Sequence, residues 1–364
     1  MSLNCGIVGL PNVGKSTLFS LLTSSEVDVA NYPFCTIEPN VGVVNVPDER
    51  LDKLAELIPT KRVIPAVTEF VDIAGLVKGA SKGEGLGNQF LSSIRNVGII
   101  AHVVRCFDDK DIVHTSGRID PEDDIKTINL ELILSDLDIV QKRLEKEIKQ
   151  SRLVKEKSTC VHTLEKAKEI LENERMLRSV LWNDEETKIL SSLCLITLKK
   201  VIYVCNVDEN SISCGNKYSD AVKRIAEEEK ADVVILSAKI ESEISLLPTD
   251  EEKREMREAL GITSSSLSEF IKKAYHTMGL RTFFTAGSDE DRAWTFKEGM
   301  CAPECAGIIH TDFQKGFIKA EVYSYSDLEE YKSEAELKKR GLIRLEGKEY
   351  LMQDGDVVFF KFNT

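Results

Sequence analysis

The chain has 364 residues, a formal net charge of −13 and 42% hydrophobic residues, which is ordinary for a soluble globular protein with two or three domains. No apolar run reaches the roughly 18 residues that a membrane-spanning helix needs, and the N-terminal residues lack the features of a signal peptide. The nine cysteines form no CxxC pair, which favours reduced thiols in a cytoplasmic protein over a zinc site. The negative charge argues against a surface that binds polyanions everywhere, but a local basic patch is compatible with it.

Six short segments are almost continuously apolar and rich in valine and isoleucine, which is typical of strands buried on both faces of a parallel sheet. They are residues 4–10, 41–46, 66–72, 99–107, 200–206 and 231–238. Helix-like stretches separate most of these segments. We therefore expect an α/β fold, a doubly wound and mainly parallel sheet built from residues 1–128 and 199–277.

Residues 129–198 form a polar interval that is too long for a simple crossover between strands, and we expect an inserted helical domain there. Two apolar stripes at three- and four-residue spacing predict an antiparallel helical hairpin. The first stripe is Leu130, Leu134, Leu137, Val140, Leu144 and Ile148, and the second is Val161, Leu164, Ile170 and Leu171. The stretch 141–157 holds seven Lys or Arg residues against three Glu, a pattern compatible with a solvated helix face or with an RNA contact.

From residue 278 to residue 364 the apolar pattern alternates more regularly, which predicts a small α+β domain with an antiparallel-looking sheet. The strand candidates are residues 280–287, 292–296, 317–325 and 357–362. Between the last two, the stretch DLEEYKSEAELKKR predicts a charged helix. The apolar pattern does not indicate the function of this domain.

The stretch GLPNVGKST, from Gly9 to Thr17, satisfies the pattern G-x-x-x-x-G-K-[ST]. It follows a predicted strand and opens a predicted helix, so its main-chain amides can point at the phosphates of a nucleotide. Lys15 then bridges the β- and γ-phosphates as a catalytic group, and the Ser16 hydroxyl ligates Mg²⁺. The residues expected to bind nucleotide in this loop are Asn12, Val13, Gly14, Lys15, Ser16 and Thr17.

A second motif, FVDIAG, ends a predicted strand with Asp72, whose carboxylate is placed to hold a Mg²⁺-bound water. Gly75 follows three residues later, where its amide can reach a γ-phosphate during catalysis. Between the P-loop and Asp72 lies Thr36, which we expect to close over the metal as a third ligand. The pattern D-x-x-G is weak alone, but at this distance from a P-loop it indicates a GTPase-like switch.

A third motif concerns the base. GTPases of this layout read guanine with N-K-x-D after the fifth strand, whereas this chain has Asn206, Val207, Asp208 and Glu209. The extra methylene of glutamate displaces the carboxylate that would accept hydrogen bonds from guanine N1 and N2. Ser237 begins the stretch SAK after the sixth strand, where the fifth GTPase motif belongs. The sequence therefore predicts a nucleotide site of the GTPase type in which the base-recognition motif is altered.

With these motifs in hand, the sequence resembles the YchF (Obg-like ATPase) family over the entire chain. Its stretches GLPNVGKSTLF, NYPFCTIEPN, DIAGLVKGAS, GEGLGNQFL and GIIHTDFQKGFIKAEV are similar to the family's signatures. The resemblance implies a GTPase-type P-loop domain, an inserted helical domain and a C-terminal, β-grasp-like TGS domain at residues 278–364. It also implies a slow ATPase that prefers ATP, with Asn206 and Val207 against adenine, and that associates with ribosomes and their RNA in translation or stress responses.

The residue after Gly75 is Leu76, where a Ras-like enzyme carries the glutamine that orients water, and leucine cannot perform that task. The resemblance implies that His114 takes this catalytic role, although a lone loop histidine is otherwise read as structural. Asn12 lies at the P-loop position that is associated with bound K⁺ in related NTPases, so K⁺ is a candidate second cation. The alternative is an asparagine that only stabilises the loop.

Three functions stay open at this point. The first is an ATPase switch that a ribosomal partner reads. The second is an Obg-type GTPase in which Glu209 still accepts from guanine. The third is an RNA- or ribosome-binding adaptor that nucleotide merely stabilises. The oligomeric state also stays open, since no heptad run is long enough to demand a dimer, and a monomer is favoured.

Overall fold

The computed structural model describes residues 3–24, 40–73, 86–109, 111–112, 117–151, 159–262 and 264–363, without the side chains of residues 86–89 and 151. The chain divides into two compact units. We call residues 1–42 and 69–270 the N-terminal unit, and residues 43–68 and 271–364 the C-terminal unit. The three-domain division predicted above remains a prediction. It placed residues 43–68 in the P-loop domain, whereas the structure groups them with the C-terminal unit.

The N-terminal unit is built on a six-stranded sheet with the order β2-β4-β1-β5-β6-β7. The strands are β1 (Asn4–Val8), β2 (Val41–Asn45), β4 (Val67–Asp72), β5 (Ile99–Cys106), β6 (Val201–Val207) and β7 (Asp232–Leu236). Each of the pairs β1–β4, β1–β5, β5–β6 and β6–β7 is parallel. Every residue of β5 and of β6 is buried. The six predicted strands and the mainly parallel sheet are therefore confirmed.

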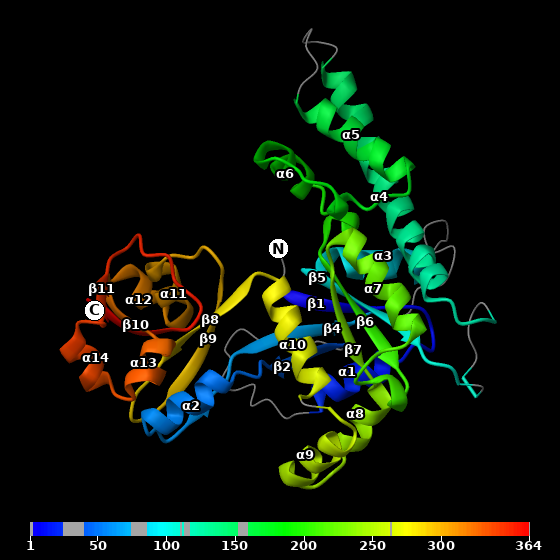
Figure 1. Ribbon diagram of the computed structural model, residues 1–364. Helices are drawn as coiled ribbons and strands as arrows, with labels where there is room; N and C mark the ends of the chain where they lie inside the picture. Colours follow the sequence, from blue (N-terminus) through cyan, green and yellow to red (C-terminus); the bar gives the residue numbers. More distant parts are fainter. Residues whose placement is uncertain are drawn as a thin grey trace. The chain divides into compact units, whose positions relative to one another are not determined.

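Some helices of the N-terminal unit lie against this sheet, whereas α5 and α6 project away from it (Figure 1). The helices are α1 (Lys15–Thr23), α3 (Leu86–Asn96), α4 (Pro121–Ser151), α5 (Thr159–Glu172), α6 (Asp184–Ser191), α7 (Lys217–Glu229), α8 (Ala238–Ser245), α9 (Asp250–Ala259) and α10 (Ser266–Thr277). The predicted hairpin is formed by α4 and α5, which pack side by side. Within the described ranges, none of the helices is both long and apolar enough to cross a membrane.

Helix α4 begins at Pro121, earlier than the predicted insert, with Glu122, Asp123 and Asp124 in its first turn. Proline and carboxylates both favour a helix start, the latter through the helix dipole. Besides α5, it packs against α7 and β5, and Glu122 and Asn129 in its first half bond to side chains of α7. For that reason Leu132 and Ile133 are buried, whereas Leu130, predicted to lie in the apolar stripe, is 40% exposed.

The C-terminal unit contains a second six-stranded sheet with the order β11-β10-β12-β8-β9-β3. Its strands are β3 (Val63–Ile64), β8 (Leu280–Thr285), β9 (Asp291–Lys297), β10 (Phe317–Ser324), β11 (Arg344–Glu346) and β12 (Asp356–Phe362). The pairs β8–β9, β10–β11 and β10–β12 are antiparallel, while β12–β8 and β9–β3 are parallel. The four predicted strands are confirmed, and the two short edge strands were not predicted.

The helices of this unit are α2 (Glu49–Leu57), α11 (Ala302–Ile309), α12 (Thr311–Lys315), α13 (Tyr325–Tyr331) and α14 (Glu334–Arg340). The single charged helix that we predicted is in fact two, because Lys332 adopts a left-handed conformation and Ser333 caps a new helix. The core contains Phe283, Phe296, Ala302, Cys305, Ala306, Phe317, Ala320, Val322, Met352, Val358 and Phe360.

Candidate nucleotide-binding site

The predicted phosphate loop joins β1 to α1. A Cβ atom on Gly9 would lie 2.5 Å from the carbonyl oxygen of Val103, so only glycine lets the loop pass this close to β5. Asn12 and Gly14 both have positive φ angles, 62° and 101°. Helix α1 starts after Gly14 with no side-chain cap. Its first amides thus lack the usual capping partner, which is the arrangement that binds phosphate.

Lys15 is the buried cation of this loop. Its side chain is 8% exposed, and its Nζ atom donates a hydrogen bond to the carbonyl of Leu10 at 2.7 Å. Burial lowers the pKa of Lys15, and the nearby carboxylate of Asp72 partly opposes that shift. A buried ammonium with one main-chain partner is electrostatically suited to an anionic ligand.

Asp72 ends β4 beside the P-loop strand, with Ile7 as its register partner on β1. Burial raises the pKa of Asp72, and the nearby ammonium of Lys15 partly opposes that shift. Ser16 and Thr17 are exposed in the first turn of α1. Ser16 thus directly follows the phosphate loop and Asp72 ends the strand beside β1, and their shared role as metal ligands stays a prediction.

The side-chain donors beside the loop are oxygen atoms, the ligands that Mg²⁺ prefers. Among the described residues no group of three or more His, Cys, Asp or Glu side chains is arranged to hold an ion. Mg²⁺ in nucleotide sites commonly takes one or two protein oxygens, phosphate oxygens and waters. One hydroxyl and one carboxylate beside a phosphate-binding loop match that requirement.

Asn206 fastens β6 to the phosphate loop. Its Nδ2 atom donates to the carbonyl of Val13 at 2.9 Å, and its Oδ1 atom accepts from the amide of Ala238 at 3.0 Å. The side chain is 6% exposed. Ser237, the residue before Ala238, is buried and caps α8. One amide therefore joins three segments that are far apart in the sequence.

The other two base-reading candidates lie differently from Asn206. The side chain of Val207 is 2% exposed, at the buried end of β6. Glu209 is exposed and begins the short helix η4 (Glu209–Ser211), while Asp208 accepts a hydrogen bond from Ser211 at 2.9 Å. Asp208 is thus engaged in the local turn, and Glu209 is the carboxylate that faces solvent.

Thr36, Gly75 and His114 lie outside the described residues. Their roles, like those of the other site residues, stay predictions.

Sequence reasoning missed Arg105 at the end of β5, one of the largest fully buried side chains. Its guanidinium donates to the carbonyls of Phe107, Asp109 and Ile112 at 3.3, 3.0 and 3.0 Å. It holds the main chain that leaves the nucleotide-side edge of the sheet. A charged residue inside the apolar stretch IIAHVVRCF was the available signal.

The glycine loop between a buried strand and a helix, the buried lysine and the asparagine that ties the loop to a second strand define a P-loop nucleotide-binding protein of the GTPase type. Residues 4–140 match the family model described as "50S ribosome-binding GTPase". Residues 280–363 match the model YchF-GTPase_C, described as "Protein of unknown function (DUF933)".

The chain is 53% identical to the ribosome-binding ATPase YchF of Bacillus subtilis and 49% identical to that of Escherichia coli O157:H7, covering 100% of both chains in each case. It is also similar to the solved structure of the Schizosaccharomyces pombe YchF GTPase, with 39% identity and a TM-score of 0.87 over 99% of this chain and 98% of that one. The chain belongs to the YchF family.

Proposed function

We propose that this protein is an ATPase that binds the ribosome and hydrolyses ATP slowly. The observation that carries the choice of ATP is the altered base reader. Asn206 keeps its link to the P-loop, but valine replaces the lysine and Glu209 replaces the aspartate of a guanine reader. The names of the bacterial relatives, which are ribosome-binding ATPases, support both halves of the proposal.

Mg²⁺ is the proposed metal. Ser16 would ligate it directly and Asp72 would hold a metal-bound water, with Thr36 as the further ligand. When bound, the ion would neutralise charge on the transferred phosphoryl group. K⁺ near Asn12 is proposed as a second cation, because a positive charge between the phosphates would replace an arginine finger.

The proposed catalytic groups are Lys15, Gly75 and His114. Lys15 stabilises charge on the β- and γ-phosphates, and the Gly75 amide holds the γ-phosphate. Since Leu76 cannot orient water, His114 is the proposed group that does so. Nucleotide binding is assigned to residues 12–17 together with Asn206, Val207, Glu209 and Ser237.

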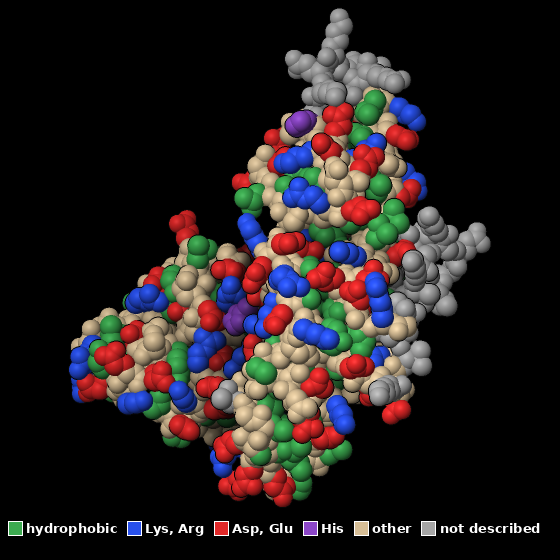
Figure 2. Space-filling view, turned by 45° about the vertical axis from the view of Figure 1, so that its right-hand side comes forward, with side chains coloured by type: hydrophobic (Ala, Val, Ile, Leu, Met, Phe, Trp, Pro, Cys, Tyr) green, Lys and Arg blue, Asp and Glu red, His purple; other side chains and the backbone are tan. Residues whose placement is uncertain are grey.

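The proposed ribosome-facing element is the basic half of α4. Lys142 pairs with Asp138 and Arg143 with Glu147, while Lys146 and Lys149 are exposed. Figure 2 shows acidic and basic side chains mixed over the face that it presents, so this basic stretch is a local feature. Ribosomal RNA is the proposed contact, and the cytoplasm is the proposed location of a protein that acts, as a monomer, on ribosomes.

A second candidate is an Obg-type GTPase. The match of residues 4–140 to a ribosome-binding GTPase model favours it. A third, weaker candidate is an adaptor whose helical hairpin and C-terminal unit bind RNA while nucleotide only stabilises the fold.

The experiment that tests the proposed activity compares phosphate release from ATP by the wild-type chain, Lys15→Ala and Lys200→Ala. Lys200 is exposed just before β6 and serves as the matched lysine control. We expect slow release by the wild type and the control, loss in Lys15→Ala, and faster release by the wild type when ribosomes are added. Release that survives Lys15→Ala would indicate a contaminating activity. Turnover that ribosomes leave unchanged would contradict the coupling.

A further inference from the structure

Residues 43–68 lie between the two predicted switch regions in the sequence but belong to the C-terminal unit. Thr36 precedes the segment, and Asp72 and Gly75 follow it. Its ends continue into β2 and β4, which are neighbours in the sheet of the N-terminal unit. The part of the chain that a GTPase-like protein places between its switches therefore supplies strand β3 to the second sheet.

The two ends of the segment are held together. The amide of Asp72 donates to the carbonyl of Asn40 at 2.9 Å, and the amide of Val46 donates to that of Ala66 at 2.8 Å. Strand β4 lies between β2 and β1, whereas β2 is the edge strand of that sheet. Only residues 46–48 separate the end of β2 from the start of α2. Because this connection is short, a shift of β2 would also move the start of α2.

The segment is fastened in the C-terminal unit at two places. Strand β3 pairs with β9, and the amide of Asp291 donates to the carbonyl of Arg62 at 2.9 Å. Helix α2 buries Leu51 and Leu54 and packs against β9 and α13. Within the segment, β3 is thus a strand of the second sheet and α2 packs against that sheet, while its two ends lie in β2 and β4 of the first sheet.

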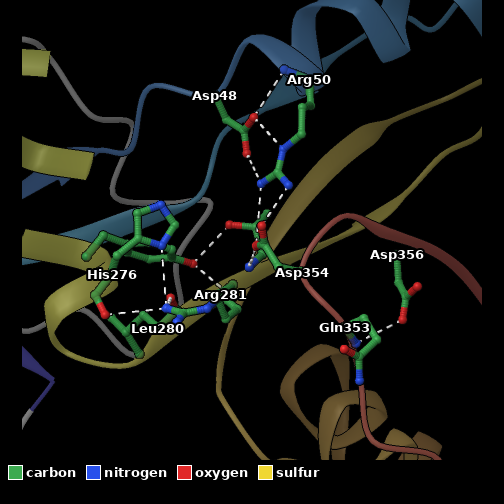
Figure 3. A network of polar contacts seen from close by, with 10 residues as sticks. Asp48, Arg50, His276, Leu280, Arg281, Gln353, Asp354 and Asp356 are labelled. Carbon is green, nitrogen blue, oxygen red and sulfur yellow. Dashed lines mark hydrogen bonds and ion pairs between the residues drawn. The ribbon is translucent and has the colours of Figure 1, made fainter. Parts of the chain in front are cut away.

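Arg50 makes a polar link of this attachment that joins two carboxylates (Figure 3). Its guanidinium donates to both carboxylate oxygens of Asp48, at 2.9 and 2.8 Å, and to Asp354 at 2.8 Å. Asp48 also caps α2 by accepting from the amide of Arg50. Asp354 in turn accepts from the amide of Thr282 on β8 at 2.9 Å. One side chain therefore connects the start of α2, through Asp354, to β8 of the second sheet.

The local packing is shaped around this arginine. Gly355 has a φ of +87°, and a Cβ atom there would lie 3.1 Å from Nη1 of Arg50. The guanidinium also lies 5.3 Å from the ring centre of Phe284 on β8. By contrast, the pairs Lys53–Glu329 and Lys61–Asp289 are exposed on both sides, and exposed pairs contribute little to stability.

We propose that residues 43–68 transmit the nucleotide state of the N-terminal unit to the sheet of the C-terminal unit, with Arg50 as the residue that fixes the segment there. This inference rests on the proposed function, because it requires that the site bind ATP and ADP. It assigns the C-terminal unit the task of reporting which nucleotide is bound.

The test is hydrogen exchange of the full chain with Mg·ADP and with Mg²⁺ and a non-hydrolysable ATP analogue, after calorimetry has established that both bind. In the wild type we expect exchange in β8, β9 and β12 to differ between the two states by about fivefold or more, the lower end of typical allosteric coupling. In Arg50→Ala this difference should vanish, while the difference at residues 40–45 persists. The control Lys61→Ala, on the same segment, should behave like the wild type.

Asp354→Asn provides a second test if Arg50→Ala unfolds the C-terminal unit. It keeps the side-chain volume and weakens the link, so it should reduce the difference in β8 without abolishing the fold. The inference is overturned if both nucleotides bind, residues 40–45 respond, and the C-terminal strands do not. It is also overturned if Arg50→Ala and Asp354→Asn leave the response unchanged. Failure of either nucleotide to bind would overturn the proposed function itself.

Discussion

Gly14 of the phosphate loop and Asn206 of β6 occupy adjoining space. A Cβ atom on Gly14 would lie 2.4 Å from Nδ2 of Asn206, the same atom that donates to the carbonyl of Val13. The φ of Gly14 is also +101°, which L-residues with side chains rarely adopt. The glycine of the P-loop motif and the asparagine of the base motif therefore depend on each other.

This relationship predicts non-additive losses. Gly14→Ala should weaken ATP binding by about tenfold or more, because a backbone penalty of roughly 1–2 kcal/mol adds to the clash with Asn206. Asn206→Gly should also weaken binding, since it removes two buried hydrogen bonds worth about 0.5–1.5 kcal/mol each. In the double variant the clash is gone, so the combined loss should be smaller than the sum.

Calorimetric titration of the four proteins measures this coupling. Asn183→Ala, which removes the cap of α6, is the control. It should lower stability by about 1 kcal/mol without changing ATP affinity. Strictly additive losses would mean that the two residues act independently.

Asp72→Asn should stabilise the ligand-free protein at neutral pH and impair Mg²⁺-dependent hydrolysis. Burial raises the pKa of Asp72, so the folded state binds its proton more readily than the unfolded state. At pH 7 the ionised carboxylate therefore costs stability, and the cost disappears as the pH falls through the folded-state pKa. The gain from the substitution should shrink toward zero near pH 3.

Denaturant unfolding at pH 7 and pH 3 measures the stability, and phosphate release measures the activity. Loss of an outer-shell metal partner should reduce activity by about 10- to 100-fold. A variant that is less stable than the wild type at pH 7 would contradict the electrostatic account.

Asp136 and Asp138 lie two residues apart on α4 and allow a buried carboxylate to be compared with an exposed one. The Asp136 side chain is fully buried and accepts from Arg95 at 2.9 Å and from the amide and hydroxyl of Thr197 at 2.7 and 2.8 Å. Asp138 is 60% exposed in a pair with Lys142. Asp136→Ala should cost about 3–5 kcal/mol, because it removes the buried carboxylate that pairs with Arg95 and leaves the amide and hydroxyl of Thr197 without their acceptor. Asp138→Ala should cost about 0.3–0.5 kcal/mol, and equal costs in denaturant unfolding would refute the assignment.

Charge reversal on α4 tests the proposed ribosome contact. Replacing Lys142, Arg143, Lys146 and Lys149 with Glu should weaken ribosome association. The plot of the logarithm of the association constant against the logarithm of the salt concentration should become less steep, by about 0.7–0.9 for each lost phosphate contact. The control reverses Lys253 and Arg254, which lie on α9. Co-sedimentation across a salt series supplies the measurement. Unchanged association and slope would exclude this surface.

The strands of the first sheet could be predicted because burial on both faces leaves a continuous apolar run, as in β5 and β6. Strands β3 and β11, with two and three residues, are too short for such a signal. The apolar pattern of a short segment also does not indicate which sheet an edge strand joins. For that reason the sequence did not predict that residues 43–68 belong to the C-terminal unit. The left-handed Lys332, which splits a predicted helix, has no signal of its own.

In the site, too, the local sequence motifs could be predicted, whereas contacts that depend on the fold could not. The P-loop is a local motif, and its strand–loop–helix context could be read directly. Asn206 was found because its motif has a fixed place after a strand, but its bond to Val13 depends on the fold. Arg105 was missed because its three partners are main-chain carbonyls, which any residue type supplies.

The most direct test of the central claim is the affinity for ATP and for GTP, titrated against the Mg²⁺-loaded protein in K⁺ buffer. We predict a clear preference for ATP, because Glu209 and Val207 replace the residues that read guanine. A clear preference for GTP would contradict the account. It would mean that Glu209 reads guanine and that the protein is an Obg-type GTPase.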